Sequence, residues 1–167
     1  MRLVVAAVGR VRPGPDRDLA ERYRERASRA SRALGLRGPD VVEVKESRAR
    51  DACRRMAEEA AALDGALDGA GARAAALPLR VVLDGRGRNL SSDALARHIA
   101  GWRDGGRDAV GFVIGGADGL APAILEGAEM ILAFGAATWP HQLVRIMLME
   151  QIYRITTILS GHPYHRD

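Results

Sequence analysis

The stretch that decides the fold runs from residue 138 to residue 158 and reads TWPHQLVRIMLMEQIYRITTI. Pro140 suits the first turn of a helix, because its missing N–H needs no partner there and its φ is already helical. No further glycine or proline follows until Gly161, so we predict one long helix. Apolar residues lie on both of its flanks, which indicates that both flanks are covered. We expect this helix to pack between its own sheet and a second surface, most economically a second copy of the chain.

The charged residues of this helix fall into two groups. His141 and Arg145 share one side of the predicted helix, and Glu150 and Arg154 share nearly the opposite side. Glu150 and Arg154 are four residues apart, so we expect them to form an ion pair. Arg145 has no acid three or four residues away, and a buried guanidinium must be paired, reach solvent or bind an anion. Arg145 is therefore a candidate functional residue.

Upstream of this helix, short apolar runs alternate with helix-like segments. The apolar runs predict strands at residues 2–8, 39–45, 79–84, 108–114 and 130–134. The segments between them predict helices at residues 16–34, 49–67, 92–103 and 122–127, with Ser91 or Ser92 as a helix N-cap. Residues 85–88 are predicted to form a turn, and Asp68–Leu77 a loop or a frayed helix end. The alternation predicts one α/β domain over residues 1–167, with a mainly parallel sheet of five to six strands and helices on both faces.

Composition narrows the classes of protein to consider. The chain has 167 residues, 47% of them hydrophobic and 28% charged, which is typical of a globular domain. No apolar run approaches the roughly 20 residues of a membrane span, so we expect no membrane partner. The single cysteine, Cys53, excludes an internal disulfide and suits the reducing cytoplasm. The net charge of +4 comes almost wholly from arginine, whose guanidinium fits phosphate, so nucleic acid is a candidate partner.

Three predicted strand ends carry the residues that a small ligand would need. In a parallel sheet, ligands collect beyond the carboxyl ends of the strands. These ends are Leu83–Gly85, Gly115–Gly116 and Phe134–Trp139. Their glycines and alanines leave the backbone exposed, so the main chain can bind an adenine or amino-acid ligand while Leu83 or Trp139 packs against it. The alternative for the glycines is a tight strand-to-helix turn without a ligand.

Other motifs are weaker. The run from Gly115 to Leu120 matches neither GxGxxG nor GxxxxGK[ST], so it predicts neither a dinucleotide fold nor a phosphate-binding loop. His162 and His165 are three residues apart, but no acid or cysteine cluster accompanies them, and we expect no metal site. Spacing alone therefore predicts an α/β domain with a small-molecule site, and it names no reaction.

Long segments of the chain resemble one known family. The runs VGFVIGGADGL at residues 110–120, TWPHQLVRIMLMEQIYRITTI and the ending HPYHRD resemble the RlmH family, the ribosomal RNA large-subunit methyltransferase H enzymes of the SPOUT superfamily. The segments RLVVAAVGR at residues 2–10 and VLDGRGRNLSSDALA at residues 82–96 fit as well, so the resemblance covers nearly the whole chain. The chain departs from the family at Ala133, Gly135 and Ala136, where members often have serines. The Asp68–Leu77 stretch also looks longer than usual, as a surface insertion would.

The resemblance implies an activity and a site. It implies methylation of N3 of a pseudouridine in large-subunit ribosomal RNA, on the assembled ribosome, with S-adenosylmethionine as the donor. It also implies a cytoplasmic homodimer with a C-terminal trefoil knot. By position, the cofactor-binding residues would be Leu83, Gly115, Phe134, Gly135, Ala136, Ala137, Thr138 and Trp139. The candidate substrate-binding residues are Arg154, Tyr164 and Arg166.

The implied chemistry predicts roles for three residues. The N3 proton must leave before or during methyl transfer, so a cation beside the ring and a neutral histidine would both help. We expect Arg145 to stabilise the developing anion or anchor a phosphate, and His141 or His165 to accept the proton. The alternatives are a non-catalytic ribosome- or RNA-binding α/β module, which would bind no S-adenosylmethionine, and a nucleotide-binding regulatory domain.

Overall fold

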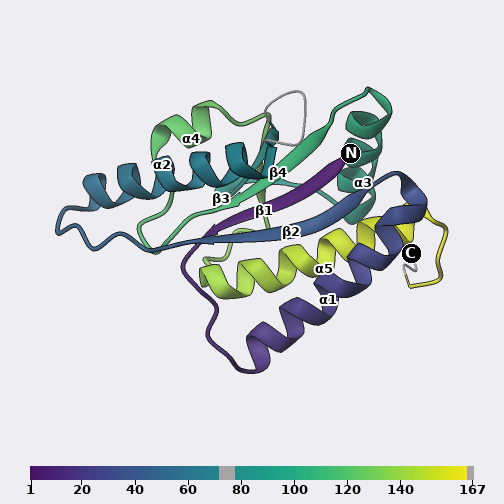
Figure 1. Cartoon of the computed structure of the whole chain (residues 1–167), viewed down its shortest axis with the longest axis horizontal. Coiled ribbons are helices and arrows are strands. Elements are labelled where there is room, and N and C mark those ends of the chain that lie inside the picture. The colour runs from purple at the N-terminus through teal and green to yellow at the C-terminus, as the bar shows by residue number, and fades with distance from the viewer. Residues whose placement is uncertain (72–77, 165–167) are drawn as a thin grey trace.

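The computed structural model, which describes residues 1–71 and 78–164, alternates strands and helices throughout. In chain order the elements are β1 (Arg2–Val8), α1 (Pro15–Ser31), the short 3-10 helix η1 (Arg32–Leu34), β2 (Arg37–Val44), α2 (Ala52–Gly71), β3 (Leu79–Asn89), α3 (Ser92–Asp104), β4 (Ala109–Ile114), α4 (Pro122–Glu126), β5 (Met130–Ala133) and α5 (His141–Leu159). Figure 1 shows α2 and α4 on one face of the sheet and α1 and α5 side by side on the other. No helix in these ranges is long and apolar enough to cross a bilayer.

The five strands form one sheet in the order β2-β1-β4-β3-β5, and every pair of neighbours is parallel. The predicted parallel sheet and the helices on both faces are therefore confirmed. The sequence of β1 is continuously apolar because both faces of this strand are buried. Leu3 and Val5 belong to the core beneath α1, α3 and α5, whereas Val4 and Ala6 belong to the core beneath α2 and α4.

Most boundaries lie within three residues of the prediction, and two differ more. β3 continues through residues 85–88, which were predicted to form a turn, and ends at Asn89. Its pairing with β5 shifts register between Leu83 and Arg88, so the strand bends away and then rejoins its neighbour. Gly87 permits this path, because a Cβ there would lie 2.7 Å from the backbone carbon of Leu132. In the Asp68–Leu77 stretch, residues 68–71 continue α2, and residues 72–77 lie outside the described ranges.

The segment that connects β5 to α5 carries the chain from one edge of the sheet to the end of β1. β5 is an edge strand, yet Arg145 on α5 bonds the carbonyl oxygens of Val8 and Gly9 at the end of β1. Residues 134–140 must therefore cross the carboxyl ends of β3 and β4. A crossing of this kind is what a knot requires, and the trefoil knot itself stays a prediction.

The second apolar flank of α5, which was expected to pack against a second copy of the chain, is largely covered by helices of the same chain. α1 packs along α5, and α3 contacts it as well, so this chain's own helices cover much of the surface that was assigned to a second copy. Leu143 remains 39% exposed near the start of α5. The first turn of α5 is therefore open to a partner.

Candidate active site

A cavity of about 430 Å³ lies beyond the carboxyl ends of β3, β4 and β5. It contains every residue that sequence reasoning assigned to cofactor binding: Leu83, Gly115, Phe134, Gly135, Ala136, Ala137, Thr138 and Trp139. The carboxyl ends of neighbouring parallel strands meet at one edge of a sheet, which explains why segments more than 50 residues apart in sequence share one cavity. Their contact with a cofactor stays a prediction.

The loop after β5 is held in shape by two hydrogen bonds. The indole Nε1 of Trp139 donates to the carbonyl oxygen of Phe134 at 2.9 Å and closes the loop on itself. The backbone N–H of Gly135 donates to Oδ1 of Asn89 at 2.7 Å. Asn89 is the last residue of β3, so the extension of that strand, which the sequence did not predict, fastens the loop. These two bonds therefore fix the shape of the exposed backbone of the loop.

The turn after β4 forms the opposite wall. Gly119 donates its N–H to the carbonyl oxygen of Gly116 at 3.1 Å. A Cβ on Gly115 would lie 2.8 Å from the carbonyl oxygen of Gly119 and 2.8 Å from Cγ of Leu120. No larger residue fits at position 115 without moving this turn, so the wall presents bare backbone to the cavity.

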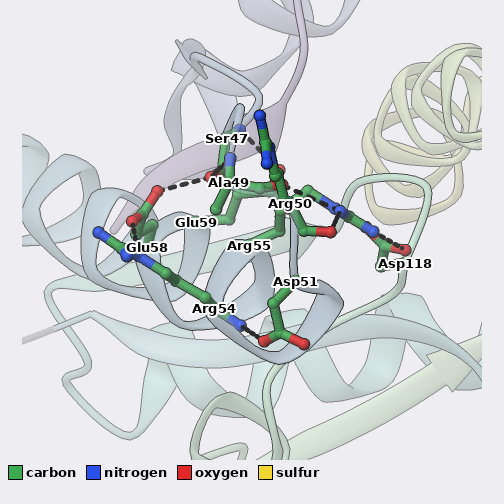
Figure 2. A network of polar contacts seen from close by, with 9 residues as sticks. All are labelled: Ser47, Ala49, Arg50, Asp51, Arg54, Arg55, Glu58, Glu59 and Asp118. Atoms are coloured by element: carbon green, nitrogen blue, oxygen red, sulfur yellow. Dashed lines mark hydrogen bonds and ion pairs between the residues drawn. The ribbon is translucent and has the colours of Figure 1, made fainter.

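A polar network behind this turn connects it to α2 (Figure 2). The guanidinium of Arg55 donates to both carboxylate oxygens of Asp118, from Nε at 2.6 Å and from Nη2 at 2.9 Å. Its Nη1 donates to the carbonyl oxygens of Ala49 and Arg50 at 3.0 and 2.9 Å. One side chain thus joins α2, the loop that precedes it and the turn of the cavity wall.

Asp84 places a carboxylate at the cavity. It follows Leu83 directly and lines the same space. The side chain of Arg86 donates to both of its oxygens, at 2.8 and 3.0 Å, and the backbone N–H of Arg86 adds a bond of 2.9 Å. The side-chain hydrogen bond from Arg86 lowers the pKa of Asp84, so the carboxylate is ionised at neutral pH. The Asp84–Arg86 pair is neutral as a whole, so Asp84 offers the cavity an ionised hydrogen-bond acceptor and no net charge.

The two candidate catalytic residues of α5 lie in different places. His141 lines the cavity at the first turn of the helix. Arg145 is 3% exposed and lines a neighbouring hollow instead. The expectation that Arg145 lacks an acidic partner was wrong: its Nη1 pairs with Glu43 on β2, and its Nη2 donates to the backbone carbonyl oxygens of Val8 and Gly9 at 3.2 and 2.9 Å. Burial lowers the pKa of Arg145, and the carboxylate of Glu43 opposes that shift.

The candidate substrate-binding residues gather at the other end of α5. Arg154 donates to Oε1 of Glu150 from Nε at 3.0 Å and from Nη2 at 2.6 Å, as the four-residue spacing predicted. The guanidinium carbon of Arg154 lies 5.0 Å from the ring centroid of Tyr164, and the Tyr164 hydroxyl donates to Glu150 at 3.3 Å. His165 and Arg166 lie outside the described residues. Arg154 is thirteen positions after His141 on the same helix, so about 20 Å lies between this cluster and the cavity of the same chain.

Sequence reasoning missed several residues that shape the site. The predicted strand end Leu83–Gly85 included Asp84, but the sequence assigned its carboxylate no role. Asn89 and Arg55 had no signal in the sequence, since their partners Gly135 and Asp118 are 46 and 63 residues away. The Ser91 cap was foreseen: its hydroxyl accepts the backbone N–H of Ala94 at 3.2 Å. Within residues 1–71 and 78–164, no group of three or more His, Cys, Asp or Glu side chains could hold a metal ion.

Fold and site together define the class: a parallel α/β domain whose cofactor-sized cavity is built from exposed backbone after its last three strands, as in methyltransferases of the SPOUT type. The family model described as "Predicted SPOUT methyltransferase" matches residues 1–165. This chain belongs to that family.

Within the family, the similarity extends over whole chains. The chain is 58% identical to the ribosomal RNA large subunit methyltransferase H of Bradyrhizobium sp. (strain ORS 278), over 99% of this chain and 98% of that protein. It is 55% identical to the protein of the same name from Rhodopseudomonas palustris (strain BisB18), over 99% of both chains. Relatives of this similarity share a fold over their full length, so the resemblance in sequence motifs is confirmed.

Proposed function

We propose that this chain methylates N3 of a pseudouridine in large-subunit ribosomal RNA, using S-adenosylmethionine, as a cytoplasmic homodimer acting on the assembled ribosome. The observation that carries the proposal is the cavity of about 430 Å³ between Leu83, Gly115 and the 134–139 loop. The relatives that are 55–58% identical over their whole length are named for methylation of the same RNA. The proposal is therefore supported by the names of these relatives and by a cavity whose lining suits the cofactor.

The residues of the cavity fit S-adenosylmethionine in three respects. Exposed backbone in the loop after β5 and the turn after β4 offers donors and acceptors for an adenine and an amino acid. Leu83, Ile114 and Leu120 offer apolar contact for a ring. The carboxylate of Asp84, which is paired with Arg86, adds a hydrogen-bond acceptor to the lining. Bound there, the cofactor supplies a methyl group on a positively charged sulfur.

The protein's part in the reaction is positioning and proton removal. Methyl transfer needs in-line approach at roughly 3–3.5 Å, so the hydrogen-bonded loop and turn contribute by holding their shape. His141 lines the cavity and is the described histidine that could accept the N3 proton from a base placed there. Arg145 binds Glu43 through Nη1 and the end of β1 through Nη2, so we assign it the task of placing the first two turns of α5, and with them His141.

A homodimer would complete the site. Trp139 and Leu143 are 43% and 39% exposed at the start of α5, and large apolar side chains exposed together favour a partner surface. Tyr164 and Arg154 lie too far from the cavity of their own chain to touch a base held there. They reach an active site only if a second copy presents the far end of its α5. Sedimentation that finds a stable monomer which still binds S-adenosylmethionine would contradict this assembly.

The activity is tested by mass spectrometry of ribosomal RNA nucleosides from cells with and without this chain. We expect a methylated pseudouridine that disappears with the gene and returns with the wild-type protein. Calorimetry with S-adenosylmethionine on the purified protein separates the alternative, because a non-catalytic RNA-binding module would bind ribosomes and give no heat with the cofactor. Unchanged nucleosides in the deletion strain would refute the proposed reaction.

A further inference from the structure

A second concave surface, which we call the basic hollow, opens beside the cavity. It has a volume of about 920 Å³ and is lined by Gly9, Arg10, Arg12, Lys45, Glu46, Ser47, Arg48 and Gln142. Its walls are the segments that follow β1 and β2 and the first turn of α5. The basic hollow therefore lies at the same edge of the sheet as the cavity.

Four cations in the basic hollow are free to bind a ligand. Arg10, Arg12, Lys45 and Arg48 are exposed. In the described part of the chain, none of the four forms an ion pair or a side-chain hydrogen bond. Glu46 is the one acid among the lining residues, so the surface carries a clear positive excess. Arginine and lysine at this density suit a row of phosphates.

Among the described residues, a second arginine-rich hollow is balanced by acids. It lies between α1, β2 and α5, with a volume of about 670 Å³, and Glu21, Asp40 and Glu43 are part of its lining. Arg24 pairs with Glu21, and Arg145 pairs with Glu43. The basic hollow is therefore the better candidate for a polyanion, because its cations need not give up an existing partner.

The loop that carries Lys45 and Arg48 is fastened to α2 (Figure 2). The backbone N–H of Ser47 donates to Oε1 of Glu59 at 3.0 Å, and its hydroxyl donates to Oε2 of Glu58 at 2.6 Å. Arg55 holds the carbonyl oxygens of the next residues, as described above, and reaches the cavity wall with the same guanidinium. The backbone of this loop therefore loses little further conformational entropy when its cations bind a ligand.

The basic hollow and the cavity adjoin each other at His141. His141 lines the cavity, and the next residue, Gln142, lines the basic hollow. A Cβ on Gly9, at the floor of the basic hollow, would lie 3.4 Å from Nε2 of His141. The two spaces therefore adjoin, and the backbone of an RNA whose base enters the cavity has the cations of the basic hollow within reach.

We propose that the basic hollow binds the sugar-phosphate backbone of the substrate RNA next to the nucleotide that is methylated. This inference rests on the proposed function, since it assigns the RNA a path on the protein. Phosphate contacts position an RNA without reading its sequence, which leaves the choice of base to the cavity and to the ribosome. The contact is electrostatic, so it must weaken as salt rises.

The test compares two charge-matched variants. Lys45→Gln with Arg48→Gln removes two cations of the basic hollow, and Arg97→Gln with Arg107→Gln removes two exposed arginines elsewhere, on α3 and before β4. Binding to purified ribosomes that lack the modification is measured over a range of salt concentrations. We expect the first variant to bind about tenfold more weakly near 0.1 M salt, with the slope of log Kd against log salt reduced by roughly 1.5. The control should match the wild type.

Two further readouts separate this inference from the proposed function. The Lys45→Gln, Arg48→Gln variant should keep its affinity for S-adenosylmethionine and its melting temperature, and should raise the KM for ribosomes while kcat stays near the wild-type value. Equal behaviour of the two variants, or weaker binding without a change of salt slope, overturns the phosphate contact. If the wild-type protein itself fails to methylate ribosomes, the proposed function is what has failed.

Discussion

Replacing Arg145 by methionine should destabilise the domain and slow methylation through misplaced geometry. Methionine keeps an apolar stem of similar shape and removes the guanidinium. The variant leaves Glu43 without its cation and removes hydrogen bonds to two buried carbonyl oxygens, of Val8 and Gly9. The side chain of Arg145 is 3% exposed, so solvent does not screen these interactions on the arginine side.

The magnitude follows from those contacts. A hydrogen bond to a charged group contributes about 1.5–3 kcal/mol, and removing one member of a buried pair costs about 3–5 kcal/mol. The side chain of Glu43 is 32% exposed, so its share is reduced by solvent. Removing the guanidinium also removes the cost of burying its charge, which offsets a further part of the lost stability. We expect the free energy of unfolding to fall by about 2–4 kcal/mol.

Urea unfolding followed by circular dichroism measures this change, with an unchanged m-value showing that the unfolded state is the same. Glu43→Gln should cost less, and the double variant should cost less than the sum of the two single changes, because they remove the same interaction. Arg54→Met is the control, since Arg54 pairs with Glu58 on the surface and its side chain is 74% exposed. An Arg145→Met protein within about 0.5 kcal/mol of the wild type would refute the reasoning.

The dependence of methylation on pH separates positioning from direct catalysis. If Arg145 only places His141, its replacement lowers the single-turnover rate by about 10–100-fold at every pH, since small misplacements near the chemistry cost that much. If its charge acted on the ring, raising the pH would restore part of the rate, because the N3 proton would leave without help. The contacts of Arg145 predict the first outcome.

Three further changes test other parts of the structure. Gly115→Ala should weaken cofactor binding about tenfold or more in calorimetry, because its Cβ would lie 2.8 Å from the Gly119 carbonyl oxygen. Gly65→Ala is the control, since nothing lies within 4 Å of a Cβ there. Equal affinities of the two variants for S-adenosylmethionine would contradict the assignment of the cavity as the cofactor site. Burial, together with Tyr23 and Glu150, raises the pKa of Tyr164 to about 12, so its contribution to stability is complete below pH 10 and is lost as pH rises through 12. The ultraviolet difference titration between wild type and Tyr164→Phe should show that phenol, and a midpoint near 10 would contradict its packing. Ile152→Ala should cost about 2–5 kcal/mol of unfolding free energy, because Ile152 is 0% exposed in the core of α5; a loss below 1 kcal/mol would disprove that burial.

Local features of this protein followed from the sequence by itself. The apolar runs predicted five strands, the cap at Ser91 needed a partner three residues away, and the Glu150–Arg154 pair needed one four residues away. The grouping of Leu83, Gly115 and the 134–139 loop also followed, because parallel strands end at one edge whatever their order. Each of these inferences depends on the period of a helix or strand or on the direction of the chain, which the residues themselves specify.

Only the tertiary structure decided which distant residues meet. Arg145 lacked an acid within its own helix, and its partner Glu43 lies 102 residues earlier on β2. Strand order places β1 and β2 beneath the first two turns of α5, and no sequence period encodes that order. The same order lets α1 cover the flank of α5 that pattern alone assigned to a second chain. A buried charge takes whichever partner the packed strands bring within reach, because leaving it unpaired costs more than any local preference can supply.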